Sequence, residues 1–192
     1  MIKRETLVME TLKKESIEWL KALGIGLVIF VFIRTFLFSS YVVEGESMMP
    51  TLEEGNKLVV NKIGYTLGSI DRFDVIVFHA NEDEDYVKRV IGLPGDRIEY
   101  ENDQLYINGK AVEEPYLNNY RSTVSPGQPL TGDFNLAELW ETETVPEGML
   151  FVLGDNRLES WDSRHFGFVP IDKVVGEVNL RYWPLSEVDT SF

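Results

Sequence analysis

The feature that most constrains this chain is an apolar segment near its N-terminus. Residues 22–38 are seventeen residues long and contain a single charge, Arg34. As an α-helix with a rise of about 1.5 Å per residue, the segment would extend about 25 Å. This is slightly less than the hydrocarbon core of a bilayer, about 30 Å. Trp19 and Tyr41 stand on either side of it, where aromatic rings suit the two membrane interfaces.

Three interpretations of this segment compete: a buried core helix, a cleaved secretory signal and a retained membrane anchor. Apolar residues on every face of the segment fit lipid better than a protein core. The uncharged run 22–33 after a basic start matches a signal peptide, but no Ala-x-Ala site follows and residues 36–38 are all large. We therefore predict a retained single-pass transmembrane helix over residues 22–40, in which Arg34 extends to the headgroups near the outer end.

The charge on the two sides of this anchor predicts its orientation. Residues 1–21 carry five basic and four acidic side chains, whereas residues 39–192 carry 12 basic and 28 acidic ones. Because positively charged flanks stay in the cytoplasm, we expect 1–21 to be cytoplasmic, 22–40 to span the cell membrane and 41–192 to form an extracytoplasmic domain. The acidic balance of that domain argues against a nucleic-acid partner, since phosphate binding needs a basic surface.

Composition also limits the chemistry available. The sequence has no cysteine, and its two histidines are His79 and His165. A disulfide scaffold, a thiolate zinc site and a cysteine nucleophile are therefore excluded, and two histidines leave little for a metal site or a Ser-His-Asp triad. We expect both histidines to be structural or exposed, and we expect no metal or other cofactor.

The chain after the anchor is predicted to be mainly β. Asn108-Gly109 predicts a hairpin across residues 104–112. Residues 113–144 contain proline, glycine and acids in place of strand patterns, and we interpret them as an inserted or mobile excursion with one or two helical turns at 135–140. An all-β domain with a coiled-sheet or barrel-like architecture follows. The short runs rich in Val, Ile, Tyr and Phe, separated by turn signals, cover residues 41–43, 57–61, 74–79, 86–92, 97–100, 104–107, 149–153 and 174–182.

Lys88 is a candidate general base. A lysine can take a proton from a serine only as the neutral amine, so its usual pKa of about 10.4 must fall. Burial among apolar atoms lowers the pKa of a lysine. By strand alternation Lys88 shares a face with Tyr86 and Val90, which predicts large apolar neighbours. The alternative is an exposed lysine on an edge strand.

Ser47 is a candidate nucleophile. It follows Gly45 and precedes Pro50; glycine permits unusual backbone angles, and proline restrains the residue before it to extended or turn geometry. Such a turn would present the hydroxyl of Ser47 and aim its N–H at a developing oxyanion. The alternative is an ordinary surface turn.

Three motifs occur together, in a fixed order, behind the single anchor. They are Ser-Met-Met-Pro-Thr at 47–51, Tyr-Val-Lys-Arg-Val-Ile-Gly-Leu-Pro-Gly-Asp at 86–96 and Gly-Asp-Asn-Arg-x-x-Ser-x-Asp-Ser-Arg at 154–164. In this combination the chain resembles the bacterial type I signal peptidases (leader peptidases), and among them the smaller enzymes of Gram-positive bacteria. The resemblance extends from the anchor to Pro184 and is weakest over 113–144.

This resemblance implies roles for individual residues. Ser47 would be the nucleophile and, through its N–H, an oxyanion donor, and Lys88 would be the general base. Ser160 would hydrogen-bond to Lys88 and orient it. An ion pair between Asp162 and Arg164 would support the shape of the site. The residues lining shallow pockets for small substrate side chains would be Val43, Met48, Leu52, Tyr86 and Val87.

The implied function is that of a membrane-bound serine endopeptidase, a Ser-Lys dyad hydrolase that removes signal peptides from exported preproteins after small residues at Ala-x-Ala sites. Its partners would be these preproteins and membrane lipid, the enzyme itself being a monomer. An extended substrate would add as a strand beside residues 86–88. Gly45 stands where some relatives have a serine as second oxyanion donor, so that donor would be water or backbone.

Two other functions are weighed against this one. A self-cleaving repressor also uses a Ser-Lys pair, but it needs a DNA-binding head, and the apolar segment takes that place here. An anchored extracytoplasmic binding protein would keep the fold without the activity. Replacing Lys88 with alanine would leave such a protein's function intact.

Overall fold

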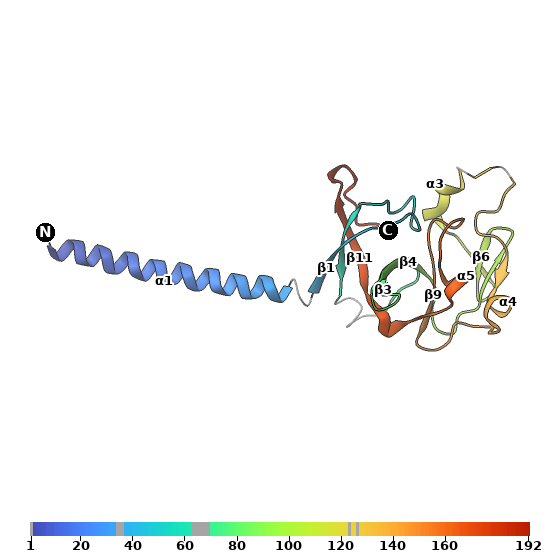
Figure 1. The fold of residues 1–192 in the computed structure, drawn as a ribbon, viewed down its shortest axis with the longest axis horizontal. Helices are drawn as coiled ribbons and strands as arrows, with labels where there is room; N and C mark the ends of the chain where they lie inside the picture. The colour runs from blue at the N-terminus through green and yellow to red at the C-terminus, as the bar shows by residue number, and fades with distance from the viewer. Residues whose placement is uncertain (1, 34–36, 63–69, 123, 126) are drawn as a thin grey trace. The chain divides into compact units, whose positions relative to one another are not determined.

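The computed structural model describes residues 2–33, 37–62, 70–122, 124–125 and 127–192. The chain divides into two compact units, residues 1–38 and 39–192. Figure 1 shows the elements of each unit.

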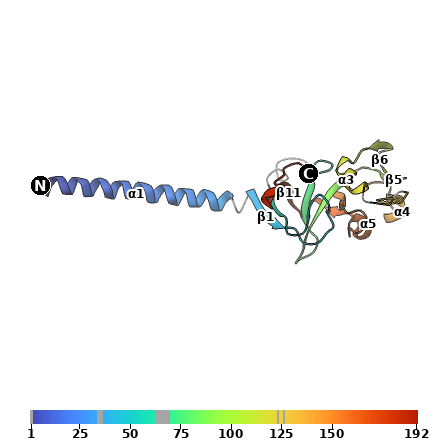
Figure 2. The same cartoon turned by 90° about the horizontal axis from the view of Figure 1, so that it is seen from above.

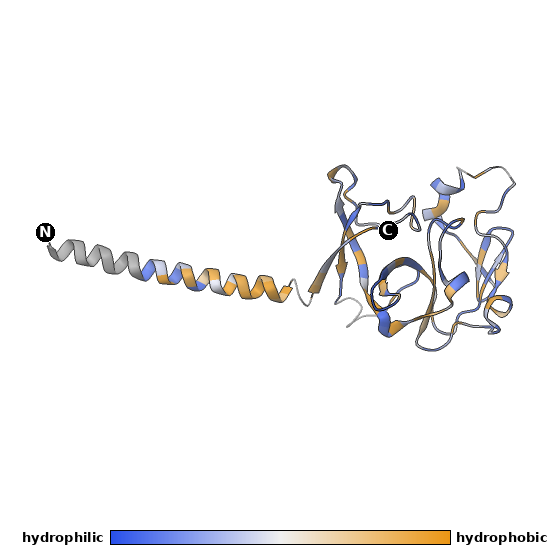
Figure 3. Cartoon of the chain, viewed as in Figure 1, coloured by the Kyte–Doolittle hydropathy of each residue, from blue (hydrophilic) through white to orange (hydrophobic). Residues whose placement is uncertain are grey.

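The N-terminal unit is a single helix, α1, from Ile2 to Phe32. It continues through the boundary predicted at residue 21 because no proline interrupts this part of the sequence. Hydrophobic residues gather in its second half (Figure 3), and their side chains are exposed between Trp19 and Phe32. No helix in the described part of the chain combines the length and the apolar character needed to cross a bilayer. Arg34, expected at the outer end of the predicted anchor, lies outside the described residues.

Within its described residues, the C-terminal unit is built on two β-sheets, as the predicted mainly β class requires. The larger sheet has the strand order β1-β2-β11-β3-β4-β9-β10, and the smaller has the order β7-β6-β5-β8. Both views show the smaller sheet at the end of this unit opposite β1 (Figures 1 and 2). The strands of the larger sheet are β1 (Phe38–Val42), β2 (Lys57–Asn61), β3 (Val75–His79), β4 (Asp85–Gly92), β9 (Met149–Leu153), β10 (Val169–Pro170) and β11 (Val174–Trp183). Those of the smaller sheet are β5 (Ile98–Glu101), β6 (Gln104–Ile107), β7 (Lys110–Val112) and β8 (Phe134–Asn135).

The predicted hairpin is present and has the expected turn. Asn108 and Gly109 have φ angles of 53° and 75°, the positive values that a two-residue type I′ turn requires. Ile107 pairs with Lys110 across this turn, and β6 and β7 are antiparallel. The strands predicted over 57–61, 104–107 and 149–153 have the same bounds in the structure.

The segment 113–144 forms more regular structure than the sequence predicted. Asn135 caps α4 by accepting a hydrogen bond from the Glu138 N–H, a stabilising N-terminal arrangement. Leu117 and Leu130 are buried, so the described part of this segment packs onto the domain. Both leucines stand outside any periodic apolar pattern, which is why the sequence did not reveal their burial. Its elements are η2 (Pro115–Leu117), α3 (Asn118–Arg121), β8 and α4 (Leu136–Trp140), and the remaining short helices of the domain are α5 (Ser163–Phe166), η3 (Ile171–Lys173) and η4 (Leu185–Glu187).

The turn after β1 is held by core residues. Met48 and Leu52 are buried on the C-terminal side of Ser47, and Val43 is buried on its N-terminal side. All three belong to one cluster with apolar side chains of β2, β3 and β11. Because burying each such side chain contributes about 1.5–3 kcal/mol, the core fixes both arms of the turn that carries Ser47.

Candidate active site

An open cleft of about 810 Å³ lies in the C-terminal unit. Its volume is within the range of ligand-binding sites in proteins. The end of β1, the turn that follows it and the first half of β4 form most of its wall. The lining residues are 41–48, 82–88, His79, Glu159 and Trp161.

Ser47 and Lys88 meet in this cleft although 41 positions separate them in the sequence. Lys88 Nζ lies 2.7 Å from Ser47 Oγ and donates to the Val87 carbonyl at 3.0 Å. Lys88 occupies the fourth position of β4, opposite Ile76 of β3. Only 3% of Lys88 is exposed, so it is not the edge-strand lysine of the alternative interpretation.

Burial changes the protonation of Lys88. Removal from water lowers the pKa of Lys88 from its usual 10.5 to about 8, although the Asp162 and Asp155 carboxylates act in the opposite direction. Among the described residues, no carboxylate oxygen lies within ion-pair distance of its amine. The ammonium is therefore disfavoured here, and a substantial fraction of neutral amine exists near pH 8.

Arg89, next to Lys88, ties β4 to the 154–164 segment. Its side chain is fully buried and binds both carboxylate oxygens of Asp155, at 2.9 and 2.6 Å. The Thr51 hydroxyl donates to the same carboxylate at 2.5 Å. The ring of Tyr116 packs on the Arg89 guanidinium, 4.0 Å from ring centroid to guanidinium carbon. A planar guanidinium suits this combination of bidentate pairing and stacking.

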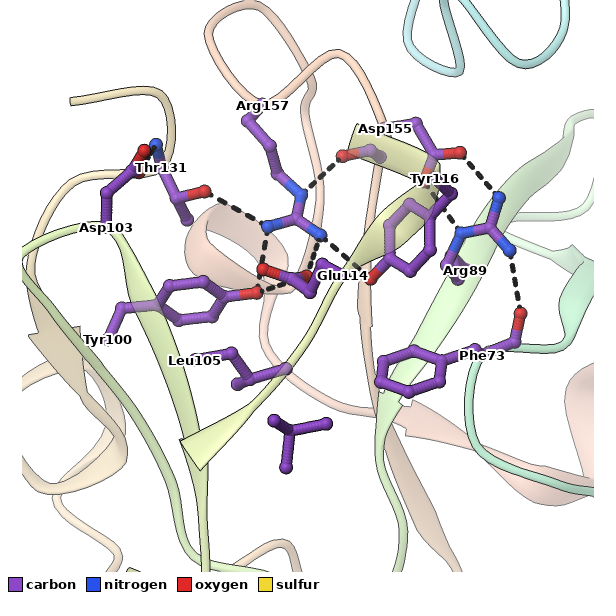
Figure 4. A network of polar contacts seen from close by, with 12 residues as sticks. Phe73, Arg89, Tyr100, Asp103, Leu105, Glu114, Tyr116, Thr131, Asp155 and Arg157 are labelled. Atoms are coloured by element: carbon purple, nitrogen blue, oxygen red, sulfur yellow. Dashed lines mark hydrogen bonds and ion pairs between the residues drawn. The ribbon is translucent and has the colours of Figure 1, made fainter. Parts of the chain in front are cut away.

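Arg157 organises a second buried cluster beside the first (Figure 4). One of its terminal nitrogens donates to Glu114 at 2.5 Å and the other donates to the Tyr100 hydroxyl at 2.8 Å. Burial raises the pKa of Tyr100 and of Tyr116, so both hydroxyls stay protonated and donate to Glu114 Oε1. Arg157 also donates from Nε to the Gly154 carbonyl at 3.1 Å. The segment around Glu114 is thereby joined to the turn that begins at Gly154.

Asp162 and Arg164 form the contact that the resemblance implied. Arg164 donates from Nε and from a terminal nitrogen to the two oxygens of Asp162, both at 2.9 Å. Asp162 also accepts from the Gly154 N–H at 3.0 Å. The expected hydrogen bond between Ser160 and Lys88 is not formed. Ser160 Oγ is buried and has no partner in the described part of the chain, and Lys88 donates to the Val87 carbonyl.

Gly154 allows these parts to approach one another. A Cβ at this position would lie 2.1 Å from Ser160 Oγ and 2.3 Å from the Ser47 carbonyl oxygen. Real Cβ atoms do not come so close to backbone, so the close packing of the Ser47 turn against the 154–160 turn requires glycine.

The sequence as a whole matches known proteins. The family described as "Signal peptidase, peptidase S26" matches residues 16–183. The chain belongs to this signal peptidase family. It is 63% identical to signal peptidase I of Bacillus caldolyticus over 160 residues, covering 83% of this chain and 87% of the relative. It is 45% identical to signal peptidase IB of Staphylococcus aureus over 185 residues, covering 94% of this chain and 96% of the relative.

A solved structure supports the same assignment. The crystal structure of a signal peptidase I from Enterococcus faecalis has a TM-score of 0.55 and 47% sequence identity with this chain, covering 57% of this chain and 96% of that one. The chain is therefore a serine endopeptidase of the type I signal peptidase group with a mainly β fold.

The residues that the resemblance assigns to substrate pockets fall into two groups. Val43, Met48, Tyr86 and Val87 line the cleft. Leu52 is fully buried beneath it and does not contribute to its described wall. Leu52 donates its N–H to the Met48 carbonyl at 2.9 Å. Leu52 therefore supports the turn that carries Ser47 and does not line the cleft itself.

The two histidines lie outside the Ser47–Lys88 pair. His79 lines the cleft, where its Nδ1 lies 2.5 Å from Asp85 Oδ1. The Tyr41 hydroxyl donates to the other oxygen of Asp85 at 2.8 Å. The ring of His165 stacks on Trp161 with a centroid distance of 4.6 Å.

Sequence reasoning missed several charged residues of this signal peptidase site. Arg89 and Arg157 are buried with carboxylate partners, Asp155 and Glu114, although nothing in a strand or turn pattern indicates that a charge is buried. The acidic run 82–85 also forms part of the cleft wall. The carboxylate residues of that wall are Glu44, Glu46, Glu82, Asp83, Glu84, Asp85 and Glu159.

Proposed function

We propose that this chain removes N-terminal signal peptides from exported preproteins, with Ser47 as nucleophile and Lys88 as general base. One observation carries the proposal: a buried lysine amine lies 2.7 Å from a serine hydroxyl at the wall of an open cleft. The relatives that match most of the chain are signal peptidases by name, which supports the choice of substrate.

The chemistry follows from the protonation of the pair. Neutral Lys88 accepts the hydroxyl proton as Ser47 Oγ attacks the carbonyl carbon of the scissile peptide. When the C–N bond breaks, the Lys88 ammonium returns this proton to the leaving amine, and the signal peptide remains esterified to Ser47. Lys88 then takes a proton from water, the hydroxide attacks the ester carbon, and the serine oxygen leaves with the proton. The Ser47 N–H stabilises the oxyanion at both stages.

The shape of the wall supports cleavage after small residues. Val43, Met48, Tyr86 and Val87 present large side chains to the cleft, and Val43 and Met48 are held by the core. A bulky substrate side chain next to the scissile bond would overlap these atoms. An Ala-x-Ala site avoids the overlap because the two substrate side chains that enter the pockets are methyl groups.

We also propose that residues 22–40 anchor the enzyme in the membrane, with residues 1–21 in the cytoplasm and the catalytic domain outside. The apolar side chains along the second half of α1 are exposed, which supports contact with lipid. Anchoring would raise the effective concentration of substrates that are held in the same membrane by their signal helices.

The test is cleavage of a purified preprotein by the full chain in detergent micelles, comparing wild type with Ser47→Ala and Lys88→Ala. We expect cleavage after an Ala-x-Ala site by wild type alone. Retained cleavage in Ser47→Ala would refute the nucleophile. Loss in Ser47→Ala but not in Lys88→Ala would refute the base and keep the serine. Absence of cleavage by folded wild type in lipid would favour an anchored binding protein.

A further inference from the structure

We propose that Asn156 is a positioning residue for the oxyanion donor, and that Tyr120 holds Asn156 in place. This inference rests on the proposed function, in which Ser47 attacks the substrate and its N–H receives the negative charge. Asn156 follows Gly154 and Asp155 in the 154–160 turn, and only 5% of it is exposed.

Asn156 hydrogen-bonds to the peptide groups on both sides of the Ser47 Cα. Its side-chain Nδ2 donates to the Glu46 carbonyl at 3.1 Å. Its backbone N–H donates to the Ser47 carbonyl at 3.1 Å. These two consecutive carbonyls belong to the peptide units that precede and follow the Ser47 Cα, so one residue fixes the backbone on each side of the nucleophile.

The bond to Glu46 determines where the Ser47 N–H points. A trans peptide is planar, and its C=O and N–H point in opposite directions. Because the Glu46 carbonyl is directed at Asn156, the Ser47 N–H is directed away from Asn156. No backbone carbonyl in the described part of the chain accepts a hydrogen bond from the Ser47 N–H, so this donor is open to a substrate oxygen.

Tyr120 fixes the orientation of the Asn156 amide. Its hydroxyl donates to Asn156 Oδ1 at 2.5 Å, which leaves the Nδ2 end of the same amide facing the Glu46 carbonyl. Tyr120 belongs to α3, in the segment 113–144 that was expected to be an inserted or mobile excursion. The segment around α3 therefore reaches the nucleophile through two hydrogen bonds, from Tyr120 to Asn156 and from Asn156 to Glu46.

Asn156 also connects this arrangement to Ser160. The Ser160 N–H donates to the Asn156 carbonyl at 2.9 Å. Displacement of Asn156 would thus move the oxyanion donor and the buried Ser160 hydroxyl together, while Lys88 would stay buried on β4. This separation predicts which kinetic quantities change.

The test compares Asn156→Ala, Asn156→Asp and Tyr120→Phe in the full chain, in detergent, on a peptide with an Ala-x-Ala site. Asn156→Asp retains an acceptor for Tyr120 but loses the Nδ2 donor. We expect kcat to fall about 10- to 100-fold in both Asn156 variants, because misplacement of a catalytic group by about 1 Å has effects of this size. KM should stay within about twofold, as expected for a group that acts in the transition state. Tyr120→Phe should lower kcat about fivefold, the equivalent of one neutral hydrogen bond.

Two further readouts separate positioning from general structural support. In the first, Ser47 Oγ adds to the carbonyl carbon of a substrate-like peptide aldehyde, and the aldehyde oxygen then occupies the oxyanion position. The inhibition constant of the aldehyde should rise by the same factor by which kcat falls. In Asn156→Ala and Tyr120→Phe, which add no charge, the pH at half-maximal kcat/KM should not move, because the burial that lowers the pKa of Lys88 is unchanged. Tyr106→Phe, which removes a hydroxyl on β6 of the smaller sheet, is the matched control and should match wild type.

Unchanged kcat in folded Asn156→Asp would overturn the inference. So would a loss confined to KM, or a fall in kcat without weaker aldehyde binding. If Asn156→Ala does not fold, Asn156→Asp and Tyr120→Phe decide the question. Ser47→Ala separates failure of the proposed function from failure of this inference. Retained cleavage in Ser47→Ala refutes the proposed function. An inactive Ser47→Ala variant together with fully active Asn156 variants refutes only the positioning role.

Discussion

Replacing Lys88 with methionine should abolish activity and stabilise the folded protein at neutral pH. Lys88 is 3% exposed, and burial lowers its pKa from 10.5 to about 8. The unfolded chain therefore binds a proton more tightly at this position than the folded chain does. Well below pH 8 this difference destabilises the fold by about 3 kcal/mol, at about 1.4 kcal/mol per pKa unit.

The sign and the pH range of the effect follow from the same shift. As pH rises from about 8 to 10.5, the unfolded chain loses its proton too, and the destabilisation disappears. Methionine has a similar length and no charge, so it removes the effect at every pH. The hydrogen bonds from Lys88 to the Val87 carbonyl and to the Ser47 hydroxyl are lost as well, which offsets about 1–2 kcal/mol. We therefore expect Lys88→Met to be about 1–2 kcal/mol more stable than wild type at pH 7.

The assay is urea unfolding of the full chain in detergent, followed by tryptophan fluorescence at pH 7 and pH 10. The stabilisation should be present at pH 7 and should vanish or reverse at pH 10. Lys110→Met on the exposed strand β7 is the matched control, and it should change the free energy of unfolding by less than about 0.5 kcal/mol. A Lys88→Met variant less stable than wild type at pH 7, or a difference in stability that is the same at both pH values, would contradict this prediction.

Three further changes test the surroundings of the site. Because the protonated amine of Lys88 cannot act as a base, kcat/KM for an Ala-x-Ala peptide should rise with pH and level off above about 8; an acidic limb centred below pH 6 would contradict this. Arg89→Lys should lower the free energy of unfolding by about 2–4 kcal/mol, measured in urea, because it loses the bidentate pair with Asp155 and the stacking on Tyr116; a change below about 0.5 kcal/mol would contradict it. Gly154→Ala should abolish cleavage and destabilise by about 1–3 kcal/mol, since its Cβ would overlap Ser160 and the Ser47 carbonyl; an active, equally stable variant would show that the two turns can separate.

Local features of the fold were predictable because their signals are local. The hairpin at Asn108-Gly109 depends on two residues that adopt positive φ, and β2, β6 and β9 are short runs rich in Leu, Val, Ile, Tyr and Phe between turns. The two-residue strands β8 and β10 are too short to leave such a pattern. The predicted anchor over 22–40 was located from hydropathy, which marks the apolar residues but not where a helix begins. The helix that contains the first part of this anchor, α1, begins at Ile2.

The site was predictable only in part. A lysine that acts as a general base must be buried, and strand alternation made Lys88 on β4 the candidate. The pairing of Lys88 with Ser47 came from the resemblance, since no local pattern joins residues so far apart in the sequence. The roles of Glu114, Tyr120 and Asn156 depend on how the 113–144 segment packs against the 154–160 turn, and tertiary contacts of this kind leave no periodic signal.

The neighbours of Lys88 explain how the fold tolerates a buried amine without a carboxylate partner. Arg89 points away from Lys88 by strand alternation and is fixed by two bonds to Asp155. Asp155 also accepts from Thr51, on the chain that leaves the Ser47 turn. One carboxylate thus holds the backbone next to Lys88 and the backbone next to Ser47. A carboxylate placed directly on Lys88 would hold it equally well, but it would also stabilise the ammonium and remove the base. Placing the ion pair one residue away gives the rigidity of a buried salt bridge while leaving the amine of Lys88 free to be neutral.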